Sequence, residues 1–233
     1  MTVTQTTSPT PASLTVDLYR DIHKGIRAEL FAVTAEAGRL DPYDAAARVA
    51  VAAHVQAVVG ILDAHAGHED AAIQPVLENE FPALAARIGA DHELLEGRTA
   101  DLRIMADDVV DTPGRSQAAA VHQLYLQLAG FTSVYLGHQD FEERTVQPAL
   151  AEAIGPQAVM GIHGAIVSSI PPDEMAASLA VMLPAMNIDG RAELLGGMQA
   201  NAPRQVFEGI WGLSASVLAP ADHTAVAVRL GIV

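Results

Sequence analysis

The apolar positions of this chain recur every three or four residues, which is the spacing of one face of an α-helix. Four such stretches, each of roughly two dozen residues, lie between residues 13 and 150, and proline, glycine or a capping residue marks their ends. The pattern predicts helices from a cap at Ser13 to Gly38, from Asp41-Pro42 to Pro75, from Pro82 to the turn at 111–114, and from there to Pro148.

Long amphipathic helices joined by short connections predict an all-α protein, with an up-down antiparallel four-helix bundle. After Gly155-Pro156 the apolar segments become shorter and prolines interrupt them, which predicts a C-terminal appendage of short helices that caps the bundle. We therefore expect a mobile N-terminal tail over residues 1–12, the bundle over 13–152 and the appendage over 156–233.

Composition narrows the classes of function. The formal net charge is -15 over 233 residues, without a local cluster of Lys or Arg, which argues against binding to nucleic acid or to an anionic membrane. The chain has no cysteine, so a metal must be bound by imidazole and carboxylate groups. The N-terminus lacks a secretory pattern and we expect no stretch apolar and long enough to span a bilayer, which predicts a cytoplasmic protein.

A thirteen-residue motif occurs twice, as HAGHEDAAIQPVL from His65 to Leu77 and as HQDFEERTVQPAL from His138 to Leu150. In both copies a histidine is followed four residues later by a glutamate, which places the two side chains on one helix face about 6 Å apart along its axis. Such a pair can bind one metal ion. Two copies in the same register predict a duplicated helical hairpin and a two-metal site.

Each predicted helix carries a histidine on its inward stripe, where a polar group is unfavourable unless something binds it. Imidazole and carboxylate ligands without sulfur suit iron or manganese and permit zinc. Seven side chains with bridging carboxylates would fill nine or ten of about twelve positions around two octahedral ions, leaving a solvent bridge and one exchangeable position. The candidate metal ligands are His23, His65, Glu69, His92, Glu96, His138 and Glu142.

Four further residues lie close to these candidates. Tyr19 and Tyr135 fall on the inward stripe about one turn before His23 and His138, either as core aromatics or as catalytic groups that give a proton or electron to a bound oxidant. Asp70 and Glu143 directly follow the two motif glutamates, either solvated or orienting a ligand imidazole.

The histidines and glutamates, in this order, resemble the hemerythrin-like, or HHE cation-binding, domain over residues 13–152. The resemblance implies a non-haem centre of two iron ions with a solvent-derived oxo or hydroxo bridge, with manganese or zinc less favoured. It also implies that the carboxylates of the second and fourth helices bridge the ions. Reversible dioxygen carriers of that family place a second histidine one turn after the third-helix histidine, where this chain has Glu96. If Glu96 coordinates, oxygen activation or peroxide turnover is favoured; if it faces solvent, that argument loses its force.

These features predict a di-iron oxidoreductase that reacts with dioxygen, hydrogen peroxide or nitric oxide, either as a catalase or peroxidase or as an oxygenase of an organic substrate. The alternative is reversible binding or sensing of dioxygen or nitric oxide without catalysis. A third reading is metal storage or a structural metal site. The C-terminal segment is also a candidate surface for a homodimer.

Overall fold

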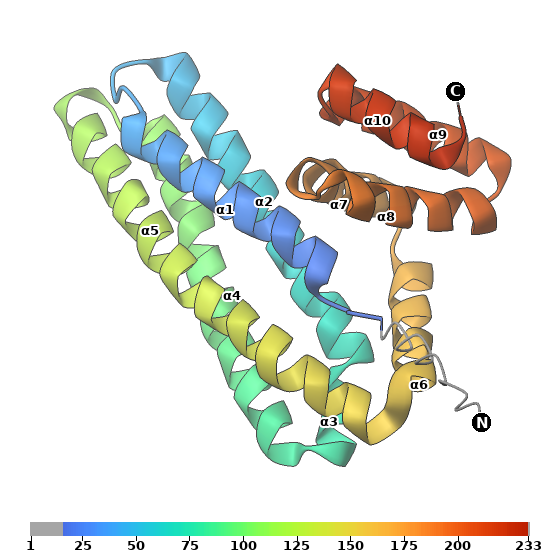
Figure 1. Cartoon of the computed structure of the whole chain (residues 1–233). Coiled ribbons are helices and arrows are strands. Elements are labelled where there is room, and N and C mark those ends of the chain that lie inside the picture. The colour runs from blue at the N-terminus through green and yellow to red at the C-terminus, as the bar shows by residue number, and fades with distance from the viewer. Residues whose placement is uncertain (1–15, 233) are drawn as a thin grey trace, which may run out of the picture.

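The computed structural model describes residues 16–232, and every regular element in that range is helical. Four long helices pack side by side: α1 (Arg20–Arg39), α2 (Ala45–Ala72), α4 (Pro82–Asp111) and α5 (Gln117–Phe141), the last preceded by the single turn η1 (Gly114–Ser116) (Figure 1). Helices α1 and α4 each contact both α2 and α5, so the four rods enclose a common interior.

The interior is apolar along most of the bundle because the predicted stripes face inward. The main cluster contains side chains from all four helices, including Leu30, Val55, Leu102, Leu128 and Phe131, each at most 2% exposed. Burying such side chains is the principal stabilising contribution in a helical bundle. Polar side chains in this interior therefore have largely apolar surroundings.

The starts of α1 and α2 concern two of the predicted helix caps. The cap expected at Ser13 lies outside the described residues; helix α1 begins at Arg20, where Asp17 accepts the backbone N–H of Tyr19 at 3.1 Å and of Arg20 at 2.9 Å. Asp41 was wrong as the cap of the second helix. Pro42 and Tyr43 instead form a turn, which is closed by a hydrogen bond of 3.2 Å from the Asp44 N–H to the Asp41 carbonyl. Asp44 then caps α2.

The two motif prolines both lie in the first turn of a helix, where a missing N–H does no harm. Pro75 belongs to the short α3 (Gln74–Glu80), as the predicted break requires. Pro148 does not end the fourth helix: a π turn, η2 (Glu142–Val146), leads from α5 directly into α6 (Gln147–Ser169). The equivalent leucines Leu77 and Leu150 are buried in one cluster, consistent with the duplication.

The C-terminal part follows a bend in α6 at Gly155, whose positive φ of 77° suits glycine, just before Pro156. Four short helices follow, with their own apolar cluster around Leu183 and Leu195: α7 (Pro172–Ala185), α8 (Ile188–Asn201), α9 (Arg204–Val217) and α10 (Pro220–Leu230). This layer meets the bundle where α7 packs on α1, at Gly25 (Figure 1). A side chain at Gly25 would approach the α7 backbone to 3.1 Å, so the glycine permits the close contact.

The expectation that no stretch is long and apolar enough to cross a bilayer was wrong. Two helical stretches within residues 16–232 meet that criterion by length and composition, α2 with a mean hydropathy of 1.7 and the run Gly114–Ser169 with 1.2. Core helices of a bundle satisfy the same test, so the finding is weak evidence for spanning. Helix α2 also carries two of the candidate metal ligands towards the bundle interior.

Candidate metal centre

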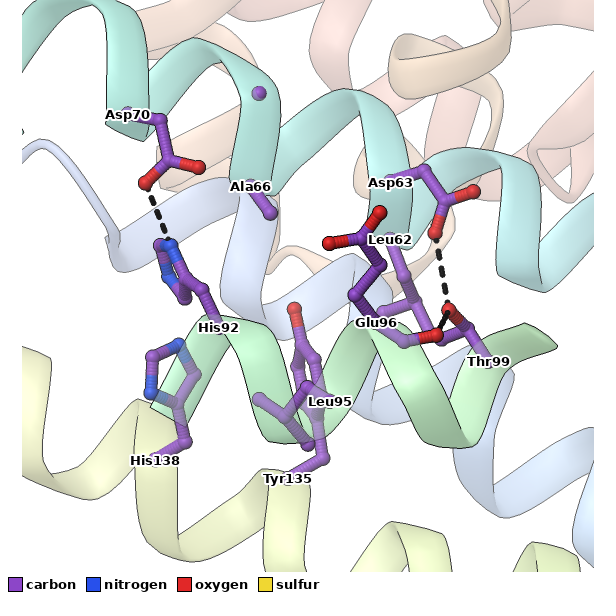
Figure 2. A pocket seen from close by; sticks show the side chains of 11 residues that line it. Leu62, Asp63, Ala66, Asp70, His92, Leu95, Glu96, Thr99, Tyr135 and His138 are labelled. Atoms are coloured by element: carbon purple, nitrogen blue, oxygen red, sulfur yellow. Dashed lines mark hydrogen bonds and ion pairs between the residues drawn. The ribbon is translucent and has the colours of Figure 1, made fainter. Parts of the chain in front are cut away.

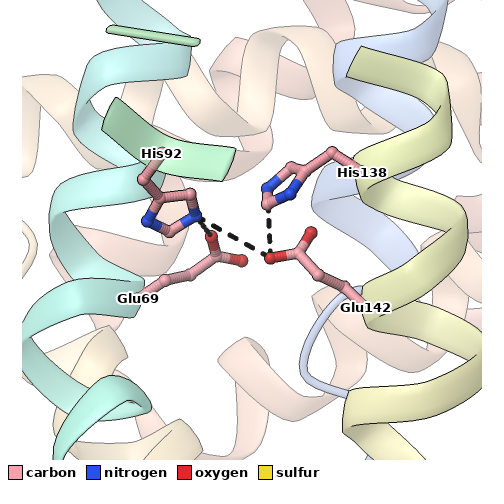
Figure 3. Close-up of side chains that lie close together, drawn as sticks. All are labelled: Glu69, His92, His138 and Glu142. Atoms are coloured by element: carbon pink, nitrogen blue, oxygen red, sulfur yellow. Dashed lines mark ion pairs between the residues drawn. The ribbon is translucent and has the colours of Figure 1, made fainter. Parts of the chain in front are cut away.

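Six of the seven predicted ligands converge inside the bundle. Glu69, His92, His138 and Glu142 have ligand atoms within 4.8 Å of one another, and His23, His65 and Glu69 form a second such group (Figure 3). They come from all four long helices and from the π turn η2. Figure 3 shows the side chains of Glu69 and Glu142 reaching toward each other from α2 and η2, with the two imidazoles beside them.

The distances divide the centre into two halves that share the two glutamates. In the first half, His23 Nε2 lies 3.1 Å from His65 Nε2 and 3.5 Å from Glu142 Oε2, and His65 Nε2 lies 3.1 Å from Glu69 Oε1. In the second half, His92 Nε2 lies 3.5 Å from Glu69 Oε2, and His138 Nε2 lies 3.2 Å from Glu142 Oε1. Each half therefore offers two imidazoles and access to both carboxylates.

Local helix geometry explains most of this convergence. The His65–Glu69 and His138–Glu142 pairs have the four-residue spacing that aligns side chains along one helix face. The π turn that starts at Glu142 was not predicted, because a π turn has no strong sequence signature; such turns are frequent at functional sites.

A carboxylate outside the centre holds one imidazole in each half. His23 Nδ1 lies 2.9 Å from Glu143, and His92 Nδ1 lies 2.7 Å from Asp70. For both acids the geometry thus favours orientation of an imidazole over simple exposure to solvent, because each contact leaves the Nε2 atom of that imidazole directed inward. Arg27 donates to Glu143 at 2.7 Å, and the hydrogen bond from His23, together with Arg27, lowers the pKa of Glu143 to about 2.

Several of the inward-facing atoms lack hydrogen-bond partners among the described residues. Both carboxylate oxygens of Glu69, Oε2 of Glu142 and Nε2 of His92 are buried and unpaired among the described residues. Burial raises the pKa of Glu69 and of Glu142 well above the usual range, and it lowers the pKa of His65 well below its own. Cations between these groups would satisfy the unpaired atoms and favour charged carboxylates beside neutral imidazoles, so the residues fit a two-metal site.

The seventh candidate, Glu96, belongs to neither group. Its side chain is exposed on α4 and borders a cavity beside the centre. Its predicted coordination has no support in this arrangement and stays a prediction. Oxygen activation was favoured only if Glu96 added an anionic ligand, so the exposed position of Glu96 removes that reason.

A cavity of about 260 Å³ lies between α2 and α4 and extends to α5 (Figure 2). Tyr135 is among its lining residues, whereas Tyr19 is buried against the ring of His23, with 5.1 Å between the ring centroids. Burial, followed by the charges of Glu69 and Glu142, raises the pKa of both phenols well above the usual value. Both hydroxyls therefore keep their protons at neutral pH.

The other histidines near the bundle make contacts between helices. His54 lies between Glu29 and Glu36 of α1, and His68 contacts Glu174 of α7, so both rings have partners outside the metal centre. His68 thereby links the bundle to the C-terminal layer.

Comparison with known proteins agrees with this geometry. The model of the hemerythrin HHE cation-binding domain matches residues 14–150, more than half of the chain. Searches of curated proteins and of solved structures found no match. The matched range contains all six converging ligands and ends at the second copy of the repeated motif. The chain therefore belongs to the hemerythrin HHE cation-binding domain family.

Proposed function

We propose that this protein is a non-haem di-iron oxidoreductase that turns over hydrogen peroxide, with dioxygen and nitric oxide as further small oxidants that it can bind. The observation that carries the proposal is the set of four histidines and two shared glutamates inside the bundle, two of which, His92 and His138, line a small cavity. We also propose that the four long helices run alternately up and down, and that the protein is located in the cytoplasm.

The ligand set leaves room for an oxidant. Four imidazole nitrogens and up to four carboxylate oxygens account for about eight of the twelve positions that two octahedral ions require. About four positions remain for solvent and an exogenous molecule, more than the seven-ligand expectation allowed. An open coordination position is required for reaction with a small oxidant.

Two iron ions would take up and return two electrons. In peroxide disproportionation, one hydrogen peroxide gains two electrons and two protons to become two waters, and a second loses two electrons and two protons to become dioxygen. Asp70 and Glu143 would hold the ring orientation of His92 and His23 throughout. The Tyr135 hydroxyl, protonated and at the cavity, is suited to giving a proton to the reduced oxygen atoms and recovering it.

The cavity favours small molecules over a bulky organic substrate, because its volume of about 260 Å³ falls below the usual range of roughly 300–1,000 Å³ for ligand pockets. A small cavity also suits the second candidate function, reversible binding of dioxygen or nitric oxide. The exposed position of Glu96 removes one argument against that candidate.

Ferrous iron loading separates the candidates. We expect about two iron ions per chain, dioxygen evolution from added peroxide, and loss of both in His65→Ala and Glu142→Ala. An absorption spectrum that changes with dioxygen and reverts on degassing, without peroxide turnover, would favour reversible binding. A protein that holds two iron ions and responds to neither oxidant would refute both proposals.

A further inference from the structure

The two halves of the metal centre differ in their contact with the cavity. The cavity is lined by His92 and His138 of the second half, and its lining contains neither His23 nor His65 (Figure 2). The remaining walls come from α2, α4 and Tyr135. Since the two halves offer the same ligand types, residues around them must account for this difference.

The internal duplication identifies those residues. The repeated motif relates α2 to α5 by a shift of 73 positions. His23 corresponds to His92, a shift of 69, because their Nδ1 atoms bind the equivalent acids Glu143 and Asp70. With these shifts, Ala66 on the cavity wall corresponds to Gln139 in the first half. Glu96 on the cavity wall corresponds to Arg27.

In the first half these positions carry large, ordered side chains. Arg27 donates to Glu143 at 2.7 Å, and Glu143 in turn lies 2.9 Å from His23 Nδ1. Gln139 is fully buried, and both its amide atoms lack partners among the described residues. It lies two turns after Thr132, whose hydroxyl is 3.2 Å from Thr34 of α1, so it faces the α1–α5 interface. This interface corresponds to the α2–α4 interface that contains the cavity.

In the second half, the corresponding side chains leave a volume unfilled and a negative charge without a partner in the described part of the chain. Ala66 is too short to fill the volume that Gln139 fills, and Glu96 cannot form an ion pair with Asp70 because both are acids. Asp63 is paired with Arg103 at 2.7 Å, and Asp70 with His92, whereas no ion pair of Glu96 occurs among the described residues. The cavity therefore carries an excess of negative charge.

We propose that exogenous molecules reach the centre through the second half alone, between Ala66 and Glu96, and that Glu96 selects small uncharged molecules over anions. The inference rests on the proposed function only in assuming that iron fills the site. It assigns unequal roles to the two ions: molecules in the cavity reach the one held by His92 and His138, and they do not reach the one held by His23 and His65 directly.

The test of the route uses nitric oxide as the probe, on the full chain loaded with ferrous iron. Ala66→Gln places in the second half the side chain that closes the first, and should slow nitric oxide association about tenfold or more while both iron ions remain bound. Ala57→Gln, on the exposed face of the same helix and outside the cavity, is the matched control. Association at the original rate in Ala66→Gln would overturn the proposed route.

A second variant tests the route if Ala66→Gln does not fold correctly. If Ala66→Gln loses iron, Gly67→Leu narrows the same cavity from an exposed position where an added side chain meets open space. Slower association in that variant supports the route, and an unchanged rate overturns it. Because the readout is nitric oxide binding, a protein that fails to turn over peroxide can still confirm or refute the route.

The charge selection has its own test. In the oxidised protein, Glu96→Gln should raise the affinity for azide about fivefold by removing one nearby negative charge. Glu93→Gln, exposed on α4 and outside the cavity, controls for the net charge of the chain. Equal azide affinity in the Glu96→Gln and Glu93→Gln variants would refute selection by Glu96.

Discussion

At the scale of single residues, the acids that follow the motif glutamates connect sequence to site geometry. A residue one position after a ligand is rotated about 100° around the helix axis, so it points towards the neighbouring helix. Asp70 thereby reaches His92 on α4, and Glu143 reaches His23 on α1. One short motif on one helix thus supplies two ligands and fixes the orientation of a third.

We expect Asp70→Asn to weaken metal binding about 10- to 100-fold, because an uncharged partner holds the His92 ring less firmly and makes it less basic. Competition with a chelator measures the affinity. Asp101→Asn, an exposed position on the same helix as His92, should bind metal as the unaltered protein does. An unchanged affinity in Asp70→Asn would show that Asp70 does not support the ligand.

The two buried tyrosines should respond differently to loss of their hydroxyls. Tyr135→Phe should lower the peroxide turnover number about 10²-fold at constant iron content, the usual effect of removing a general acid. Tyr19→Phe should have little effect, because Tyr19 does not line the cavity. Turnover numbers with parallel iron analysis test this difference. Equal losses in both variants would point to a general effect on packing.

At the scale of helices, α1 and α2 are joined away from the metal centre by an ionic contact. His54 lies 2.8 Å from Glu29 and 2.7 Å from Glu36. The hydrogen bond to Glu29, supported by Glu36, raises the pKa of His54 to about 9. Since the folded-state pKa exceeds the unfolded one, the contact stabilises the fold fully below the ordinary value near 6.5 and is lost as pH rises through about 9.

His54→Gln should therefore lower the free energy of unfolding at pH 6 by about 1 kcal/mol, a value reduced for the partial exposure of the three side chains. At pH 10 the variant and the unaltered protein should differ little. Denaturant unfolding of the metal-free proteins at both pH values measures the effect, with His122→Gln on the exposed side of α5 as the control. A difference that is independent of pH would show that the charge of His54 contributes nothing.

At the scale of the whole molecule, the metal centre and the fold depend on each other. The centre gathers polar side chains from all four long helices in the interior, and the unpaired atoms of Glu69, His92 and Glu142 there are unfavourable without a cation. The C-terminal layer contacts the bundle through α1, the helix that carries His23, and through His68 beside Glu69. Metal binding should consequently stabilise the entire chain.

Removing the metal with a chelator should lower the melting temperature, and restoring it should recover stability. A metal concentration 100-fold above its dissociation constant corresponds to about 2.7 kcal/mol. Thermal unfolding followed by circular dichroism measures the shift. In a Glu69→Gln, Glu142→Gln double variant the melting temperature should not respond to metal, and a full response there would exclude these glutamates as ligands.

The sequence by itself predicted the helices and the six candidate ligands that converge, because both depend on local geometry. Apolar spacing identifies a helix, and a four-residue interval aligns a histidine with a glutamate regardless of what the helix packs against. The repeated motif additionally predicted that the centre consists of two paired sites. Local reasoning also located the breaks near Pro75 and Gly155, where backbone restrictions act within a few residues.

Only the tertiary structure decided which residues face the metals and which face solvent. Glu96 has the same four-residue interval from His92 as Glu69 has from His65, yet Glu96 is exposed and Leu95 is buried in its place, because the packing of α4 decides which side of the helix faces the interior. Asp41 and Asp44 are equally good caps locally, so the turn at Pro42 determined which one starts α2. The cavity is lined by residues of three helices, among them Ala66 and Glu96, and such a grouping of distant residues has no signature in the local sequence pattern of any one helix.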